Sequence, residues 1–173
     1  MKNSIKAFAI LVFMVANLSS FSQFSVGVGG GIFRNDGSGN DSQLGPQIQL
    51  NYNVTDNIRI GAHFGYYKNS TDFLGTKISI ISMPVSLSAE YAFMTDAISP
   101  YAGIDVGMLK SGISSDGNSE FGDGMLNIAP KLGINYNIND SWGLNLHGKY
   151  HFLLYDGSQY NALSFNLGVI KNF

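Results

Sequence analysis

The sequence predicts an all-β fold, an eight-stranded antiparallel up-and-down transmembrane β-barrel. Apolar and polar residues alternate with a period of two from residue 24 to the C-terminus, which is the period of β-strands. Charged residues make up 13% of the 173 residues, about half the usual share of a globular domain. The connections between the predicted strands alternate between short and long, as they do in transmembrane barrels.

Residues 1–23 have the features of a secretory signal peptide. Lys2 and Lys6 precede an uninterrupted apolar run over residues 7–16, and small or polar residues lead to a cleavage position near Gln23. The apolar run is too short to span a bilayer as a helix. We therefore expect export through a cleaved signal peptide.

Residues 24–173 are predicted to form one barrel domain. Its eight strands are expected at residues 24–33, 46–53, 58–67, 78–93, 101–110, 125–138, 142–154 and 162–173.

Each of the first four strands has one apolar side. In the first strand the other side is mostly glycine, and in the second strand it consists of Gln and Asn. The third places Arg59 and His63 on its polar side. In the fourth, the apolar side changes at Ile80 and Ile81, which predicts a β-bulge.

Each of the last four strands also has one apolar and one polar side. Asp105, Lys131, Lys149 and Ser164 all lie on polar sides. The predicted short turns are residues 54–57, 94–100 and 139–141, and the predicted long loops are residues 34–45, 68–77, 111–124 and 155–161. An even number of strands puts both chain ends on the short-turn side.

A weak internal repeat precedes the short turns. Residues 50–56 and 134–140 share the pattern Asn-Tyr-Asn followed by Asp, and residues 89–96 are a looser copy. Each copy ends a strand with an aromatic residue and enters its turn at Asp.

The distribution of charges indicates which side of the sheet faces lipid. Five strand-interior charges share the polar side: Arg59, Glu90, Asp105, Lys131 and Lys149. A side facing water would carry more charges than this. The polar side is therefore predicted to line the barrel interior, and the apolar side to face lipid between two girdles of aromatic residues. The alternative is a soluble, ligand-binding barrel of the lipocalin type with the opposite facing.

With these features the chain resembles the small eight-stranded outer-membrane barrels of the OmpA/OmpX type, in the version common in Bacteroidetes. The resemblance covers residues 24–173, and the last strand resembles the assembly signal of that family, which ends at Phe173. Lys171 stands where an apolar or aromatic residue is usual. The resemblance implies a Gram-negative outer-membrane location, contact with membrane lipid and lipopolysaccharide, and recognition by the barrel-assembly machinery.

The five interior charges are expected to form one cluster. We expect Asp105 nearly opposite Lys131, Lys131 nearly opposite Lys149, and Glu90 near Asp105, with Arg59 joining from the third strand. Unpaired buried charge is costly, so the cluster should be mutually paired and act as a structural plug. A proton or ion path is the alternative.

Three histidines have inward parity: His63, His147 and His151. Ser164 is expected across from His151, with Asp156 in the next loop, and such a set could belong to a lipid-modifying barrel enzyme. Lumen histidines with satisfied hydrogen bonds are the favoured interpretation.

The acidic loop over residues 116–123 does not match the spacing of a calcium loop and is predicted to be solvated surface.

These observations favour a non-enzymatic barrel with a structural or surface-interaction role, whose outer loops bind an extracellular ligand. A narrow passive channel and a lipid-modifying enzyme are the alternatives. The formal net charge of −2 does not suggest a nucleic-acid partner. The absence of cysteine excludes disulfides and thiolate metal sites, and neither a cofactor nor a metal is predicted.

Overall fold

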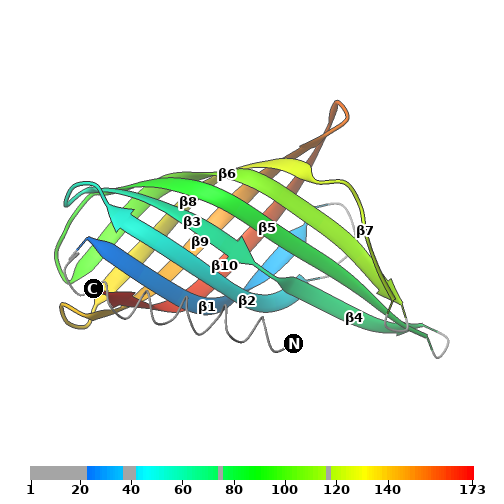
Figure 1. The fold of residues 1–173 in the computed structure, drawn as a ribbon, viewed down its shortest axis with the longest axis horizontal. Coiled ribbons are helices and arrows are strands. Elements are labelled where there is room, and N and C mark those ends of the chain that lie inside the picture. The colour runs from blue at the N-terminus through cyan, green and yellow to red at the C-terminus, as the bar shows by residue number, and fades with distance from the viewer. Residues whose placement is uncertain (1–22, 37–41, 74–75, 116–117) are drawn as a thin grey trace, which may run out of the picture.

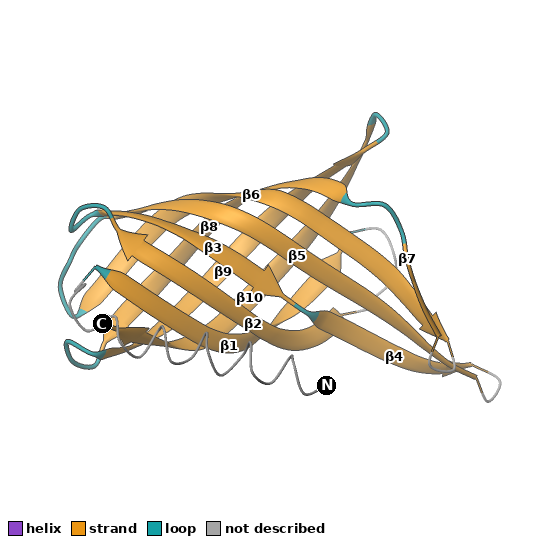
Figure 2. Cartoon of the chain, in the orientation of Figure 1, coloured by secondary structure: helices purple, strands orange, loops and turns teal. Residues whose placement is uncertain are grey.

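Antiparallel strands make up nearly all of the residues that the computed structural model describes, namely 23–36, 42–73, 76–115 and 118–173 (Figure 2). Within these ranges, no helix is long and apolar enough to cross a membrane. The strands are β1 (Phe24–Asn35), β2 (Ser42–Asn53), β3 (Ile58–Gly65), β4 (Tyr67–Phe73), β5 (Thr76–Ala92), β6 (Ile98–Ser115), β7 (Asn118–Phe121), β8 (Met125–Asn137), β9 (Trp142–Tyr155) and β10 (Ser158–Asn172).

The ten segments close into a ring of eight strands (Figure 1). β1 pairs with both β2 and β10, and the remaining strands pair in chain order around the ring. β3 and β4 lie between the same two neighbours, β2 and β5, and act as one interrupted strand. β7 and β8 both pair with β6 and form a second interrupted strand. The predicted eight-stranded antiparallel barrel is confirmed.

Local chemistry explains the two interruptions. Tyr66, between β3 and β4, donates its backbone N–H to the carbonyl of Pro46 at 3.0 Å, and Pro46 has no N–H to give in return. Between β7 and β8, two residues of β6 face three residues, 122–124, because Gly112 pairs with Phe121 and Leu109 with Met125. This unequal count is a β-bulge.

The β-bulge predicted at Ile80 and Ile81 is wrong. β5 pairs residue for residue with β6 from Ile78 to Ala92. Ile80 therefore lies on the same side of the strand as Ser82, which faces the interior. The pattern of exposure changes here because β5 leaves the barrel and continues outward.

Polar side chains fill the barrel interior, and apolar side chains cover its outside. Most of the buried residues of β2, β5 and β9 are Gln, Asn, Ser, His or charged residues. Large apolar side chains point outward, and Leu87 and Leu132 are 71% and 69% exposed. The soluble, lipocalin-type alternative is therefore wrong, because it requires the opposite facing.

The two ends of the barrel differ. At one end lie the short turns and both ends of the sheet, since Phe24 pairs with Tyr52 and accepts a hydrogen bond from the Phe173 N–H at 3.0 Å. Asn139 closes one short turn by accepting two backbone hydrogen bonds, each 2.9 Å long. In outer-membrane barrels the short turns lie on the periplasmic side.

At the other end, strands project beyond the barrel where long loops were predicted. β4, β5, β6 and β7 extend as a sheet, and the β9–β10 hairpin forms a second projection (Figure 1). The loop predicted over residues 155–161 is wrong. A two-residue turn replaces it, because Asp156 and Gly157 have φ angles of 46° and 74° and match the type I′ hairpin turn.

We expect Leu132→Arg to destabilise the barrel by about 2–4 kcal/mol, because it places a cation near the middle of the lipid-facing surface. Tyr160→Arg, on the outward hairpin, should cost less than about 1 kcal/mol. Denaturant unfolding in lipid vesicles measures both values. Equal effects at the two positions would contradict the assignment of the lipid-facing belt.

Candidate functional site

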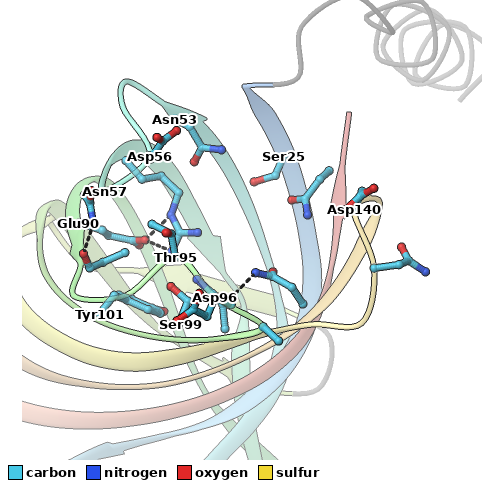
Figure 3. A pocket seen from close by; sticks show the side chains of 17 residues that line it. Ser25, Asn53, Asp56, Asn57, Glu90, Thr95, Asp96, Ser99, Tyr101 and Asp140 are labelled. Atoms are coloured by element: carbon cyan, nitrogen blue, oxygen red, sulfur yellow. Dashed lines mark hydrogen bonds and ion pairs between the residues drawn. The ribbon is translucent and has the colours of Figure 1, made fainter.

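The interior is layered along the barrel axis, and the layer at the short-turn end is a polar cavity of about 480 Å³ (Figure 3). The copies of the internal repeat help to build it. They bring Asn53 and Asn137 to its wall and Asp56, Asp96 and Asp140 to its rim. Six asparagines line the cavity in all: Asn53, Asn57, Asn135, Asn137, Asn139 and Asn172.

A layer of charged side chains closes the inner end of this cavity. The Glu90 carboxylate forms ion pairs with Arg59 and Lys131. Asp105 pairs with Lys131 at 2.9 Å and with Lys149 at 2.7 Å. Arg59 also lies over the Tyr101 ring, 5.1 Å from its centroid. The structure thus brings all five predicted cluster residues together, with each carboxylate between two cations.

The detailed register differs from the expected one. Lys131 pairs directly with Lys149 across β8 and β9, as predicted. Asp105, however, pairs with Ala129, and the residue opposite Lys131 is Gly103. A Cβ atom at Gly103 would lie 2.9 Å from Glu90 Cγ and 3.2 Å from Lys131 Cε. The missing side chain at Gly103 therefore leaves Lys131 the space to reach both carboxylates.

His63 belongs to this layer, although the sequence did not place it in the cluster. Its ring nitrogens lie 3.2 Å from Lys131 Nζ and 3.3 Å from Lys149 Nζ. Glu90 Oε1 is 3.8 Å away. Because two ammonium groups flank the ring, a neutral imidazole that accepts a hydrogen bond fits this position. His63 on β3 reaches Lys149 on β9 across the lumen, so strand pairing alone could not have revealed the contact.

The third layer contains His151 and Ser164. His151 Nε2 lies 2.9 Å from Ser164 Oγ, and Nδ1 lies 3.0 Å from Asn127 Oδ1. Asp156, the third member of the predicted triad, is in the turn at the tip of the β9–β10 hairpin and takes no part. The enclosed void beside His151 and Ser164 measures only about 10 Å³, room for one water molecule and not for a substrate.

An apolar plug forms the layer nearest the projecting strands. Phe33 stacks on Tyr67 with ring centroids 5.5 Å apart, and the Tyr67 hydroxyl donates to Asn166 at 2.6 Å. The plug consists of Phe33, Tyr67, Leu109, Leu153 and Ala162, all of them buried. It closes the lumen on that side, so the polar cavity opens only at the short-turn end.

The remaining predicted positions lie outside these layers. Phe173 is half-buried, and Lys171 Nζ lies 5.0 Å from the Trp142 ring centroid and 5.9 Å from that of Phe173. Of the acidic loop, Asp116 lies outside the described residues, and Asp123 accepts a hydrogen bond from the Tyr155 hydroxyl at 3.0 Å. Among the described residues, no group of three His, Asp or Glu side chains could hold a metal ion.

We expect Asp105→Asn to lower the free energy of unfolding by about 3–5 kcal/mol, because it leaves Lys149 buried without a charged partner. Asp156→Asn removes one carboxylate from the outer turn and should change stability by less than about 0.5 kcal/mol. Equilibrium unfolding in detergent compares the two variants. The double variant D105N/K149Q should recover part of the loss, and an Asp105→Asn effect as small as the control would contradict a structural role for the cluster.

Comparisons with known proteins agree with this architecture. The sequence profile of the outer membrane protein beta-barrel domain matches residues 6–173. A search of curated protein sequences gives no match.

Three solved structures illustrate the shared fold. Neisserial surface protein A superposes with a TM-score of 0.73 at 19% identity, covering 87% of this chain and 97% of that one. Ail, the attachment invasion locus protein of Yersinia pestis, in complex with the heparin analogue sucrose octasulfate, gives 0.65 at 15% identity, covering 87% and 98%. Outer membrane protein OprG from Pseudomonas aeruginosa gives 0.61 at 15% identity, covering 87% and 95%.

At these identities the solved structures show a common fold, whereas the profile match spans almost the whole chain. This chain belongs to the outer membrane protein beta-barrel domain family.

Proposed function

We propose that this protein is a non-enzymatic outer-membrane barrel that binds an extracellular partner through the sheet projecting beyond its outer rim. The observation that carries the proposal is an apolar patch on that sheet, made by Ile78, Ile80 and Ile113. These side chains are 37%, 37% and 59% exposed. Ile80 pairs with Ile113, and Ile78 lies two residues from Ile80, so the three share one face. Apolar groups that gather outside the lipid belt mark an interaction surface.

The net charge of the outer segments indicates which class of extracellular partner they can bind. The sequence segments at and beyond the outer rim, residues 34–45, 68–77, 110–124 and 155–161, carry seven acidic residues and four basic ones. The acidic residues are Asp36, Asp41, Asp72, Asp116, Glu120, Asp123 and Asp156, and the basic ones are Arg34, Lys68, Lys77 and Lys110. A polyanion such as the heparin analogue bound to Ail would be repelled by this excess of acids. A protein surface with an apolar or basic patch is the better match.

Export, assembly and lipid contact form part of the proposal. Residues 1–23 would direct export and be cleaved, and the terminal Phe173 would be read by the barrel-assembly machinery. Lys68 and Lys110 are exposed at the outer boundary of the apolar surface, where they could pair with phosphates of lipopolysaccharide. The enclosed position of His151 and Ser164 supports a role without catalysis.

We expect the double variant I80S/I113S to reduce binding of the extracellular partner several-fold, because it removes the apolar patch without touching the barrel. Adherence of bacteria that display the protein to protein-coated surfaces and to host cells measures the effect. Tyr160→Ser removes an exposed apolar group from the other projection and is the matched control. Equal surface levels are verified by the shift in gel mobility on boiling, and unchanged adherence of I80S/I113S would contradict the proposal.

The filled interior distinguishes this role from that of a channel. In planar bilayers the protein should show no stable conductance steps, because ion pairs and an apolar plug occupy the lumen in series. Discrete, reproducible openings of the wild-type protein would favour the channel alternative. The barrel domain of a conducting porin serves as the positive control for insertion.

A further inference from the structure

The polar cavity at the short-turn end has no part in the surface role proposed above. The layer of Arg59, Glu90 and Tyr101 closes it on the inside, and it opens between the short turns (Figure 3). Its volume of about 480 Å³ lies within the range in which proteins bind small molecules, about 300–1,000 Å³. It is therefore a blind, ligand-sized site that faces the periplasm.

The lining indicates what a ligand must offer. Asparagine amides both donate and accept hydrogen bonds, whereas carboxylates only accept. Four of the six amides use part of this capacity within the protein, those of Asn57, Asn135, Asn137 and Asn139. The amide groups that remain can bind both donors and acceptors of a ligand. Ser25 is 3% exposed and extends from β1 into the cavity (Figure 3). It accepts a 3.5 Å hydrogen bond from Asn51. Its own O–H has no acceptor among the described residues. A complementary ligand is rich in donors and also provides acceptors.

Charge adds a second requirement. The carboxylates of Asp56, Asp96 and Asp140 form no hydrogen bond or ion pair with any described residue. The cavity's one lining cation, Arg59, is already paired with Glu90. An anionic ligand would be repelled, and a ligand with ammonium groups would be attracted. The described carboxylates do not approach one another closely enough to hold a metal ion.

These features favour a ligand that carries both kinds of group over simpler ligands. An aliphatic polyamine would satisfy the carboxylates but offer no acceptor to the Ser25 O–H or to the asparagine N–H groups that remain unused. A neutral sugar would satisfy the amides but leave three carboxylates without a counter-charge. We propose that the cavity binds an amino sugar of one or two rings, with its ammonium groups at the rim carboxylates and its hydroxyls among the amides.

Three probes of graded chemistry test this assignment. The barrel is placed in lipid nanodiscs and titrated calorimetrically with the β-1,4-linked dimer of glucosamine, with its N-acetylated form, and with spermidine. The glucosamine dimer should bind about tenfold more tightly than either of the others, because it alone offers both ammonium groups and hydroxyls. Equal binding of the N-acetylated form, or no saturable binding of the dimer, would overturn the proposal.

Variants then show whether the ligand occupies the cavity. Ala92→Phe fills the cavity without changing any charge and should abolish binding of the dimer. If the Ala92→Phe variant binds the dimer as tightly as the wild-type protein, the dimer is attracted to the rim carboxylates without entering the cavity. That result would overturn the proposal.

The charge requirement has its own matched pair of variants. Neutralising the rim should weaken binding about tenfold, whereas the same charge change at the opposite end of the barrel should leave it unchanged. Equal weakening in both variants would indicate non-specific attraction and overturn the assignment. All variants are first confirmed as folded by their gel mobility before and after boiling. The rim variant is D56N/D96N/D140N, and the control is D36N/D72N/D156N.

Discussion

Hydrocarbon offers no hydrogen bonds, and this single constraint organises the molecule. Every backbone N–H and C=O within the membrane must find a partner in the protein, which a sheet achieves only by closing on itself. β1 meets both β2 and β10, so no edge is left within the barrel. The outer surface must then be apolar, and the polar side chains are forced into a lumen that eight strands make too narrow to stay empty.

Because the lumen is narrow, the charged side chains inside it are packed closely and must pair with one another. Three cations and two carboxylates share the middle of the barrel, and each carboxylate lies between two cations. Gly103 supplies the missing volume there, and a Cβ atom at Gly133 would lie 2.5 Å from the Tyr101 hydroxyl oxygen. Small residues inside the wall thus make space for long polar ones. Because a buried charge that loses its partner is strongly destabilising, the stability of the barrel depends on all five of these side chains remaining paired.

Much of this architecture could be read from the sequence, because alternation with period two reports directly on the two faces of a strand. The five interior charges and the direct Lys131–Lys149 pair follow from that alternation and from turn length. Contacts across the lumen do not follow, since the approach of His63 to Lys149 depends on how the closed sheet is staggered. The Asp-Gly pair at residues 156–157 is itself a signal for a two-residue hairpin turn, which explains why a turn takes the place of the predicted loop.

The same constraint explains why specific recognition can occur only at the two ends. The middle of the barrel is occupied by ion pairs and an apolar plug, and its apolar outer surface faces lipid. At the outer end, strands that leave the membrane regain contact with water, and Ile113 can be exposed there without lipid around it. At the inner end, the short turns hold a hollow whose rim acids have no partner among the described residues. Because the filled lumen separates these surfaces, changes at one end can alter recognition there without changing the other.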